Sequence, residues 1–401
     1  MTMVEFAEQL SETEQAIRET AHRFAAEVMR PVGQKLDRLT AEEVIAEGSP
    51  LYDVHRQYRE LGFAAMRTST QDLSPAEAAR IRSIVANEMG WGDSGLGISL
   101  GASLFPPMVA AMVGNPELAE QFTTEQIGCW AITEPDHGSD EVDFNAAASA
   151  TGADRGRPNC IARKDGNSVV INGQKSAWVS NGTIAETAAL FCGYDDGSGG
   201  ELGHAVFLVD LKDQGVSKGK PTDKIGQRSL NQGEIFFDEV RVPLGNMAVG
   251  PEKYLDFVDA ILCMANGGMG GTFAGVAQAA LDHAVAYAKE RVQGGVPIFE
   301  HQSVKARLFE MFRKVEAARA LNRQVVVYNS TTTRPRLELA IASKVTSTQT
   351  AFEVASEAMG IYGGAGIMRD NPVEALMRDA RISMIEDGCN DILGLIAADR
   401  L

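Results

Sequence analysis

Three separated segments of the chain carry the residue types that could do chemistry. Residues 130–140 read WAITEPDHGSD, where a predicted strand ends in residues with hydroxyl groups and exposed backbone donors. Residues 172–182 read NGQKSAWVSNG, which would place Trp178 and Ser180 on one face of a strand, because residues i and i+2 share a side. Residues 363–388 begin as a glycine-rich turn, continue as a helix and end in the carboxylate pair Glu386–Asp387. Taken singly, each segment also fits an ordinary polar turn, half-buried strand or capped helix.

Other familiar catalytic and binding motifs are missing from the sequence. There is no GxGxxG after a strand, no GxxxxGK[ST] and no GxSxG, so Rossmann, P-loop and serine-hydrolase sites have no support. The six histidines show no metal-ligand spacing. The five cysteines lie far apart and are odd in number, which argues against a disulfide framework or a zinc site and favours a cytoplasmic location.

Composition and charge narrow the class of protein further. The 401 residues are 44% apolar and 23% charged, enough for two or three packed domains, and the formal net charge of −17 opposes nucleic-acid binding. The acidic N-terminal residues do not resemble a secretory signal. Two uncharged stretches, 94–116 and 260–281, are long enough to be weighed as membrane spans. Their internal prolines and glycines favour core helices of a soluble protein instead.

The hydrophobic periodicity along the chain predicts a helical region, then a β-rich region, then a second helical region. Residues 5–126 have helical periodicity, and Ser11 with Glu14 forms a capping-box pattern. Residues 127–248 contain short β-rich runs, with a hairpin predicted to turn at Asp165-Gly166. Long apolar periodicities return after Pro251. We therefore predict an α+β fold with domains at 1–126, 127–248 and 249–401.

In this order and at these intervals, the three segments resemble the acyl-CoA dehydrogenase family over essentially the whole chain. The resemblance implies an N-terminal helical domain, a middle β-barrel-like domain, a C-terminal four-helix bundle and FAD as cofactor. It implies that Thr133 bonds the flavin pyrimidine, that Trp178 flanks the isoalloxazine ring and that Ser180 reaches its N5 side. Ser139 matches a position that contacts the CoA ester. The FAD-binding residues implied in this domain are Trp130, Ile132, Thr133, Ser139, Trp178 and Ser180.

A second set of FAD contacts is implied to come from a neighbouring subunit of a homo-oligomer, with a tetramer expected. Arg291 and Gln302 keep the family spacing, although the usual Phe is replaced by Gly294. An Arg could bind the pyrophosphate through two hydrogen bonds. Gly363 and Gly364 would allow the backbone to approach the dinucleotide closely.

The implied reaction is α,β-dehydrogenation of an acyl-CoA thioester to a 2-enoyl-CoA. The pro-R α-proton would go to a base, and the β-hydrogen would leave as a hydride to flavin N5. Matching without gaps places Asp387 at the catalytic Glu, with Glu386 as the fallback; the alternative base position on an earlier helix is Ala265. A helix C-terminus and like charges nearby would raise the proton affinity of Asp387.

The shorter side chain of Asp387 has consequences for the substrate. Asp reaches about 1.5 Å less far than Glu, and proton transfer requires heavy atoms within about 3.2 Å of each other. Within the family, Asp at this position resembles the branch that acts on alicyclic acyl-CoAs, which suggests a bulky or cyclic acyl group. The expected electron acceptor is an electron-transferring flavoprotein or a similar partner.

One alternative follows from departures from the family pattern. One extra residue lies between Lys175 and Trp178, Cys389 replaces a Thr and Asn266 stands where Arg is common. These changes, with the loss of the Glu, allow a lyase or desulfinase of the same fold that catalyses no net oxidation. A non-enzymatic, DNA-associated relative is a third hypothesis, which the charge of −17 opposes.

Overall fold

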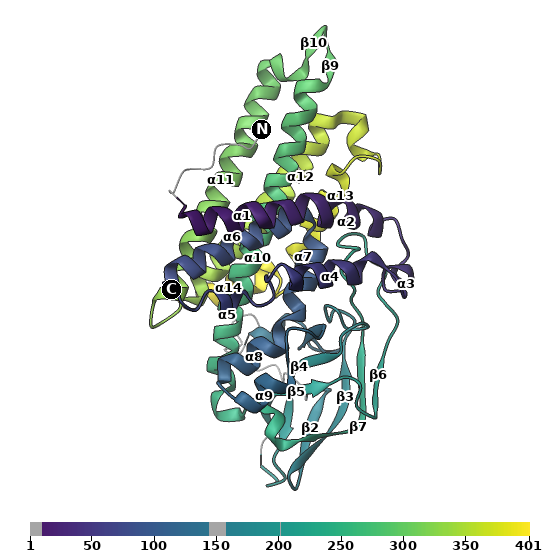
Figure 1. Cartoon of the computed structure of the whole chain (residues 1–401), viewed down its shortest axis with the longest axis vertical. Coiled ribbons are helices and arrows are strands. Elements are labelled where there is room, and N and C mark those ends of the chain that lie inside the picture. The colour runs from purple at the N-terminus through teal and green to yellow at the C-terminus, as the bar shows by residue number, and fades with distance from the viewer. Residues whose placement is uncertain (1–9, 144–157, 201) are drawn as a thin grey trace. The chain divides into compact units, whose positions relative to one another are not determined.

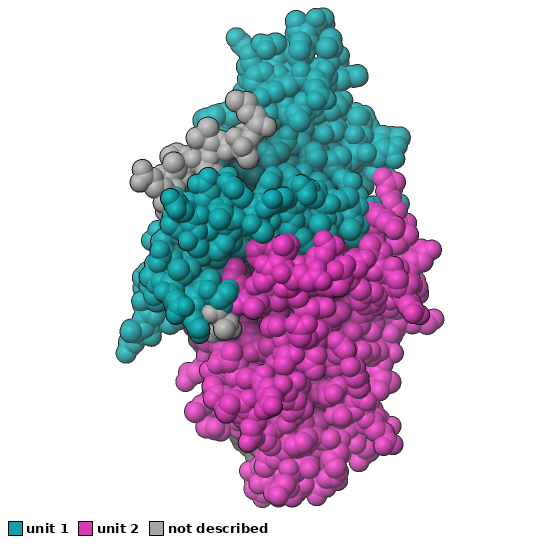
Figure 2. Space-filling view, in the orientation of Figure 1, with its two compact units in different colours: residues 1–34, 67–97, 263–384 teal, residues 35–66, 98–262, 385–401 magenta. Residues whose placement is uncertain are grey.

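The structure is a computed structural model that describes residues 10–143, 158–200 and 202–401 (Figure 1). The chain divides into two compact units, coloured separately in Figure 2. Unit 1 comprises residues 1–34, 67–97 and 263–384, and unit 2 comprises residues 35–66, 98–262 and 385–401. Each unit is therefore assembled from three segments that are far apart in the sequence. The three-domain division proposed from the sequence is a different kind of partition and stays a prediction.

Unit 2 is built on an eight-stranded sheet with the order β6-β7-β3-β2-β4-β5-β8, in which β1 also pairs with β4. The β1–β4 and β2–β4 pairs are parallel, and the other pairs are antiparallel. The strands are β1 (Gly128–Ala131), β2 (Ile161–Asp165), β3 (Ser168–Lys175), β4 (Thr187–Asp195), β5 (Gly203–Asp210), β6 (Val216–Lys218), β7 (Ile235–Pro243) and β8 (Met247–Val249).

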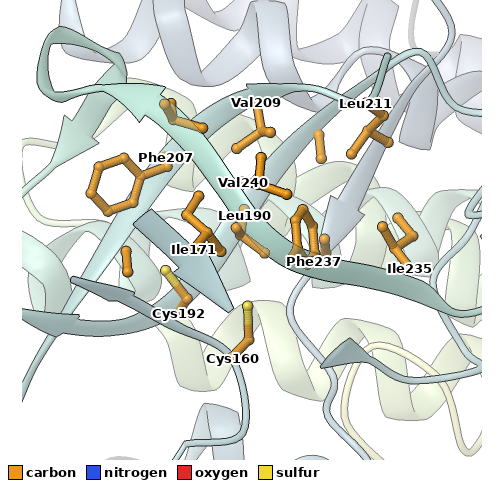
Figure 3. Close-up of a cluster of buried hydrophobic side chains, with 14 of the residues drawn as sticks. Cys160, Ile171, Leu190, Cys192, Phe207, Val209, Leu211, Ile235, Phe237 and Val240 are labelled. Carbon is orange, nitrogen blue, oxygen red and sulfur yellow. The ribbon is translucent and has the colours of Figure 1, made fainter. Parts of the chain in front are cut away.

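The core of unit 2 follows from the residue pattern of its strands. β4 is buried along almost its whole length, as expected for a central strand covered on both faces, whereas β7 mixes buried and exposed positions. Figure 3 shows side chains from β3, β4, β5 and β7 meeting in one apolar cluster. Its labelled members include Ile171, Leu190, Phe207, Phe237 and Val240. This cluster fixes the sheet that carries the candidate site residues.

The predicted hairpin is confirmed, but the strand expected after it ends early. β2 and β3 pair antiparallel around Gly166, whose φ of 62° suits glycine in a tight turn. β3 ends at Lys175, and Val179 N then donates to Ser176 O in a turn. The interpretation that Trp178 and Ser180 share one strand face is therefore wrong. The physical reason is that Ser176 N leaves the ladder and donates to Thr133 O at 2.8 Å.

Helices complete unit 2 and supply most of unit 1. The capping box predicted at Ser11 is present, because Ser11 Oγ accepts from Glu14 N and Glu14 accepts from Ser11 N. The N-terminal region contains α1 (Glu12–Phe24), α2 (Arg30–Leu36), α3 (Ala41–Val44), α4 (Pro50–Glu60), α5 (Met66–Ser69), α6 (Pro75–Gly92), α7 (Ser94–Ser103), α8 (Phe105–Val113) and α9 (Pro116–Gln121). The C-terminal region contains α10 (Tyr254–Glu290), α11 (Gln302–Thr331), α12 (Leu337–Tyr362), α13 (Val373–Ser383) and α14 (Asn390–Ala398).

Glycines in the apolar, charge-free part of α10 allow it to pack closely against α6. A Cβ added to Gly275 would lie 2.0 Å from Asn87 O, and one added to Gly90 would lie 1.8 Å from Thr272 O. The backbones of α6 and α10 therefore approach closely within unit 1. By length and composition, Pro251–Glu290 could cross a membrane, and the bent pair α7–α8 is a second candidate among the described residues. However, 72% of the apolar window of Pro251–Glu290 is buried inside the protein, which favours a core helix.

The observed elements confirm the predicted fold class. The N-terminal region is helical, the middle of the chain forms the sheet, and the C-terminal region is helical again. A short hairpin, β9 (Val292–Gln293) with β10 (Val296–Pro297), interrupts the last region. The periodicity of the sequence did not predict this hairpin.

Candidate active site

Two of the three chemically promising segments lie side by side in unit 2. Ser176 N donates to Thr133 O at 2.8 Å, and Lys175 Nζ donates to Ile132 O at 2.9 Å. Lys175 Nζ also lies 2.6 Å from Glu134 Oε1, and the side chains of both residues are only 1% exposed. The structure thus brings Ile132 and Thr133 together with the turn that bears Trp178 and Ser180.

The Glu134–Lys175 ion pair is embedded in further hydrogen bonds. Glu134 accepts from the backbone N–H groups of Asn159 and Cys160, so three donors converge on its carboxylate. Burial acts to lower the pKa of Lys175, but Cys160, Glu134 and Glu141 outweigh it and raise the pKa above its usual value. The ammonium group therefore stays charged and joins the two segments firmly.

The side chains around this junction fit a planar, hydrogen-bonding cofactor. The Trp178 side chain is 58% exposed. The Thr133 hydroxyl has no hydrogen-bond partner within the part of the chain that the structure describes, and Ser180 Oγ accepts only a long bond of 3.4 Å from Gln232. Trp130 stacks on Phe105 with ring centroids 4.6 Å apart, and its buried Nε1 lacks a partner among the described residues. Unused hydroxyls and an exposed indole match the carbonyl-bearing, flat ring of a flavin.

The acid pair at the end of the third segment also belongs to unit 2. Glu386 Oε1 accepts a hydrogen bond from Gln227 Nε2 at 2.5 Å. Cys389 N donates to Ser139 Oγ at 3.2 Å, so Ser139 supports the turn that contains Asp387. Asp387 has a φ of 53°, and Gln227 has a φ of 46°. The structure therefore brings together Ser139, Glu386 and Asp387, which are separated by about two hundred and fifty residues.

The remaining predicted residues lie in unit 1, around the ends of two long helices. Tyr287 near the end of α10 stacks on Tyr362 at the end of α12, with ring centroids 4.0 Å apart. Arg291 follows α10, and Gly363, with a φ of 61°, follows α12. Gly364 comes directly after Gly363, and Gln302 is the first residue of α11. These four residues belong to unit 1, whereas the other predicted site residues belong to unit 2.

The hairpin after Arg291 explains one departure from the family pattern. Ile298 N donates to Arg291 O at 2.8 Å and closes the β9–β10 hairpin. Its two loop residues, Gly294 and Gly295, have φ values of 69° and 88°, which suit a type I′ turn. A Cβ at Gly294 would also lie 3.3 Å from the His301 ring. Phe at this position would be strained, so Gly294 is a local requirement of this hairpin.

Sequence reasoning did not single out Gln227. It lies in the polar run 226–232, which has no regular spacing, and only its contact with Glu386 gives it a role. Glu134 and Lys175 stood inside the highlighted segments, but nothing in the sequence indicated that they pair. A positive φ at a non-glycine residue is visible only in the structure.

The comparisons with known proteins agree with this geometry. Three domain profiles match the chain: the N-terminal domain of acyl-CoA dehydrogenase at residues 11–127, the middle domain at 129–240 and the C-terminal domain at 260–401. The mitochondrial short-chain specific acyl-CoA dehydrogenase of Rattus norvegicus is 30% identical over 98% of this chain and 91% of its own length. The cyclohexane-1-carbonyl-CoA dehydrogenase of Geobacter metallireducens is 32% identical over 62% of this chain and 64% of its own length.

A solved structure gives the same result. Butyryl-CoA dehydrogenase from Megasphaera elsdenii superposes with a TM-score of 0.84 and 25% identity, covering 98% of this chain and 99% of the other. These relatives are dehydrogenases, so the non-oxidising alternative gains no support from them. From the matched domains, the full-length relative and the flavin-compatible side chains, we conclude that the chain belongs to the acyl-CoA dehydrogenase family of FAD-dependent oxidoreductases.

Proposed function

We propose that this enzyme uses the carboxylate of Asp387 to remove the α-proton of a bulky or cyclic acyl-CoA thioester. FAD, when bound, supplies the acceptor for the hydride that leaves the β-carbon. Loss of both hydrogens gives the 2-enoyl-CoA. The chain's own task is to hold the thioester, to take the α-proton and to keep water away from the reacting carbons.

The contact between Gln227 and Glu386 carries the assignment of the base. Glu386 Oε1 already accepts a 2.5 Å hydrogen bond from Gln227 Nε2, so its carboxylate is committed to holding the turn. Asp387 is the neighbouring carboxylate, and the turn is tied at its far side by the Cys389–Ser139 bond. We therefore assign proton removal to Asp387 and give Glu386 a positioning role. The Asp387 N–H would help to polarise the thioester carbonyl.

The flavin contacts in unit 2 are part of the same proposal. The Thr133 hydroxyl, Trp178 and Ser180 would hold the ring, and Trp130 and Ile132 would line the same strand end. Support comes from the 2.8 Å bond between Ser176 N and Thr133 O, which joins the two flavin-contacting segments. Ser139 would contact the CoA ester while its oxygen also accepts from Cys389 N.

The preference for a cyclic acyl group rests on the length of the base. Because Asp is about 1.5 Å shorter than Glu, the α-carbon must lie closer to the backbone at residue 387. A ring branching at the α-carbon is a substrate shape that this arrangement would suit. The similarity to a cyclohexane-1-carbonyl-CoA dehydrogenase supports this proposal.

Mixing the purified holoenzyme with saturated acyl-CoAs tests the reaction. We expect cyclohexanecarboxyl-CoA to bleach the visible absorbance of the flavin faster than straight-chain acyl-CoAs do. Asp387→Asn should give folded, yellow protein whose turnover is lower by about two orders of magnitude or more. Glu386→Gln is the matched control and should keep most activity, since a Gln carbonyl can still accept from Gln227. Retained activity in Asp387→Asn would transfer the base role to Glu386, and no bleaching by any substrate would exclude dehydrogenation.

The remaining partners belong to the same proposal. We propose a homotetramer in which Arg291, Gln302, Gly363 and Gly364 of one subunit contact the FAD of another, so that Arg291→Ala should weaken FAD binding. We further propose an electron-transferring flavoprotein as electron acceptor, tested by comparing its rate of reoxidising the reduced enzyme with that of oxygen. A cytoplasmic location is proposed because all five cysteines are free thiols.

A further inference from the structure

A buried chain of three polar side chains lies next to the Trp178–Ser180 turn. His55 on α4, Ser99 on α7 and Asn181 after the turn come from three separate parts of unit 2. His55 Nε2 lies 3.0 Å from Ser99 Oγ, and Ser99 Oγ lies 2.6 Å from Asn181 Oδ1. The three residues are 2%, 0% and 0% exposed. Burying polar groups this deeply is costly unless they are hydrogen-bonded, and these three side chains bond to one another.

The contacts of Asn181 fix the direction of every hydrogen bond in this chain. Asn181 Nδ2 lies 2.8 Å from Ser99 O and 3.1 Å from Gly128 O, and since carbonyl oxygens only accept, this atom must be the amide nitrogen. Asn181 Oδ1 is then an acceptor, so the Ser99 hydroxyl donates to it. Ser99 has no second proton to give, so His55 Nε2 must carry hydrogen and donate to Ser99 Oγ. The contacts thereby require His55 to carry a hydrogen on Nε2.

The backbone of Asn181 shows why this chain bears on the turn. Asn181 has a φ of 63°, a left-handed conformation that a non-glycine residue keeps only when its surroundings hold it. Its N–H donates to Asn231 O at 2.7 Å, and its carbonyl accepts from Ile184 N and Ala185 N. The residue is thus fixed at its backbone and its side chain. Ser180 is its direct neighbour, and Trp178 lies two residues earlier.

We propose that His55, acting through Ser99, positions Asn181 and thereby sets the orientation of Trp178 and Ser180 toward the flavin. The inference rests on the proposed flavin contacts of these two residues. In it, His55 and Ser99 are positioning residues that touch neither cofactor nor substrate. The path runs from the His55 N–H to the Ser99 hydroxyl, then to the Asn181 amide and the turn. Each step is a hydrogen bond whose donor and acceptor follow from the contacts of the Asn181 amide with Ser99 O and Gly128 O.

Ser99→Ala tests the proposal directly, with Ser103→Ala as its matched control. Ser103 is a buried serine one turn later on α7, and its hydroxyl donates only to Leu100 O of the same helix. Titrating FAD into apoprotein measures the dissociation constant, and visible circular dichroism reports how the bound flavin is held. We expect Ser99→Ala to raise the dissociation constant about fivefold or more and to change the dichroism, as loss of one buried hydrogen bond implies. Ser103→Ala should lower the melting temperature without either effect.

A second pair of variants keeps the test decisive if Ser99→Ala fails to fold. His55→Gln retains an N–H donor at similar reach and should keep the wild-type FAD affinity and dichroism. His55→Leu should weaken FAD binding as Ser99→Ala does. Equal behaviour of His55→Gln and His55→Leu, or of Ser99→Ala and Ser103→Ala, would overturn the inference.

Trp178→Ala separates failure of this inference from failure of the flavin placement. If Trp178→Ala changes the dichroism but Ser99→Ala does not, Trp178 faces the flavin and the buried chain does not position it. If Trp178→Ala also leaves the dichroism and the FAD affinity unchanged, the placement itself is wrong and the inference falls with it.

Discussion

Asp387 occupies a backbone conformation that bears on the identity of the base. Its φ of 53° lies in the left-handed region, where Asp and Asn occur several-fold more often than other non-glycine residues. The short side chain is therefore favoured by the turn itself as well as by any substrate. A Glu at this position would gain reach and lose this local preference. The Asp-for-Glu difference from the family pattern thus has a local structural reason in this chain.

Gln227 offers a prediction at the residue scale. Gln227→Leu removes the donor to Glu386 and leaves that carboxylate to find another partner, so the turn bearing Asp387 should loosen. We expect kcat to fall several-fold and the free energy of unfolding to drop by about 1.5–3 kcal/mol, the range for hydrogen bonds to charged groups. Steady-state kinetics and urea denaturation measure the two effects.

Gln174→Leu is the matched control for Gln227→Leu. Gln174 on β3 donates from Nε2 to Glu234 Oε1 at 3.1 Å, and Glu234 directly precedes β7. The variant therefore also removes a bond from a Gln amide to a Glu carboxylate, as Gln227→Leu does. This variant should lose stability with kcat unchanged. A fall in kcat of the same size in both variants would show that Gln227 acts through general stability and not through the turn.

At the scale of elements, the buried ion pair Glu134–Lys175 joins the end of β1 to the end of β3. Lys175→Met would leave the Glu134 carboxylate buried without its counter-charge, which typically destabilises a protein by about 3–5 kcal/mol. Urea denaturation measures this loss. Lys212→Met removes a side chain that is 68% exposed from its 2.8 Å contact with Glu186, and should destabilise the protein far less, because water screens exposed ion pairs. Equal losses would mean that Glu134 is neutralised in the folded protein.

The elements also show which features the sequence could predict. The capping box at Ser11 and the hairpin at Gly166 depend on residues a few positions apart, and both are confirmed. The sequence does not predict the turn at 176–179. β3 ends there because Ser176 N donates to Thr133 O, and these two residues are far apart in the sequence. For the same reason the sequence indicates Glu386 and Asp387 as a carboxylate pair but does not predict that Gln227, 159 residues away, donates a hydrogen bond to Glu386. Local patterns predict elements, and long-range hydrogen bonds decide their ends.

At the scale of the whole molecule, buried histidine predicts how stability depends on pH. Burial first, and the charge of Arg59 second, lower the pKa of His55 from 6.5 to about 4. The unfolded chain takes up a proton near pH 6.5, whereas the folded chain does so only near pH 4. The stabilising contribution is therefore complete above about pH 6.5 and is lost as pH falls toward about pH 4.

His55→Gln tests this contribution because Gln keeps a donor and does not titrate. The wild-type free energy of unfolding should fall on acidification by up to about 3 kcal/mol more than that of the variant. Urea titrations at a series of pH values measure the difference. His22 provides the opposite sign, since its hydrogen bond to Glu88 raises its pKa and its contribution is lost as pH rises. Parallel pH curves for wild type and His55→Gln would show that His55 has the same pKa in the folded and the unfolded chain.

The net charge of −17 gives a prediction about salt. Repulsion among unpaired carboxylates destabilises the folded chain, and salt screens it, with a Debye length of about 10 Å at 0.1 M. Exposed ion pairs such as Arg56–Glu60 and Arg313–Glu310 also weaken in salt, but each contributes little to stability because water already screens it. We expect the repulsion to dominate, so the urea midpoint should rise between low and physiological ionic strength. A falling midpoint would mean that the ion pairs outweigh the repulsion. The same net charge should also prevent binding to nucleic acid, so a shift of duplex DNA in a gel at physiological salt would contradict that expectation.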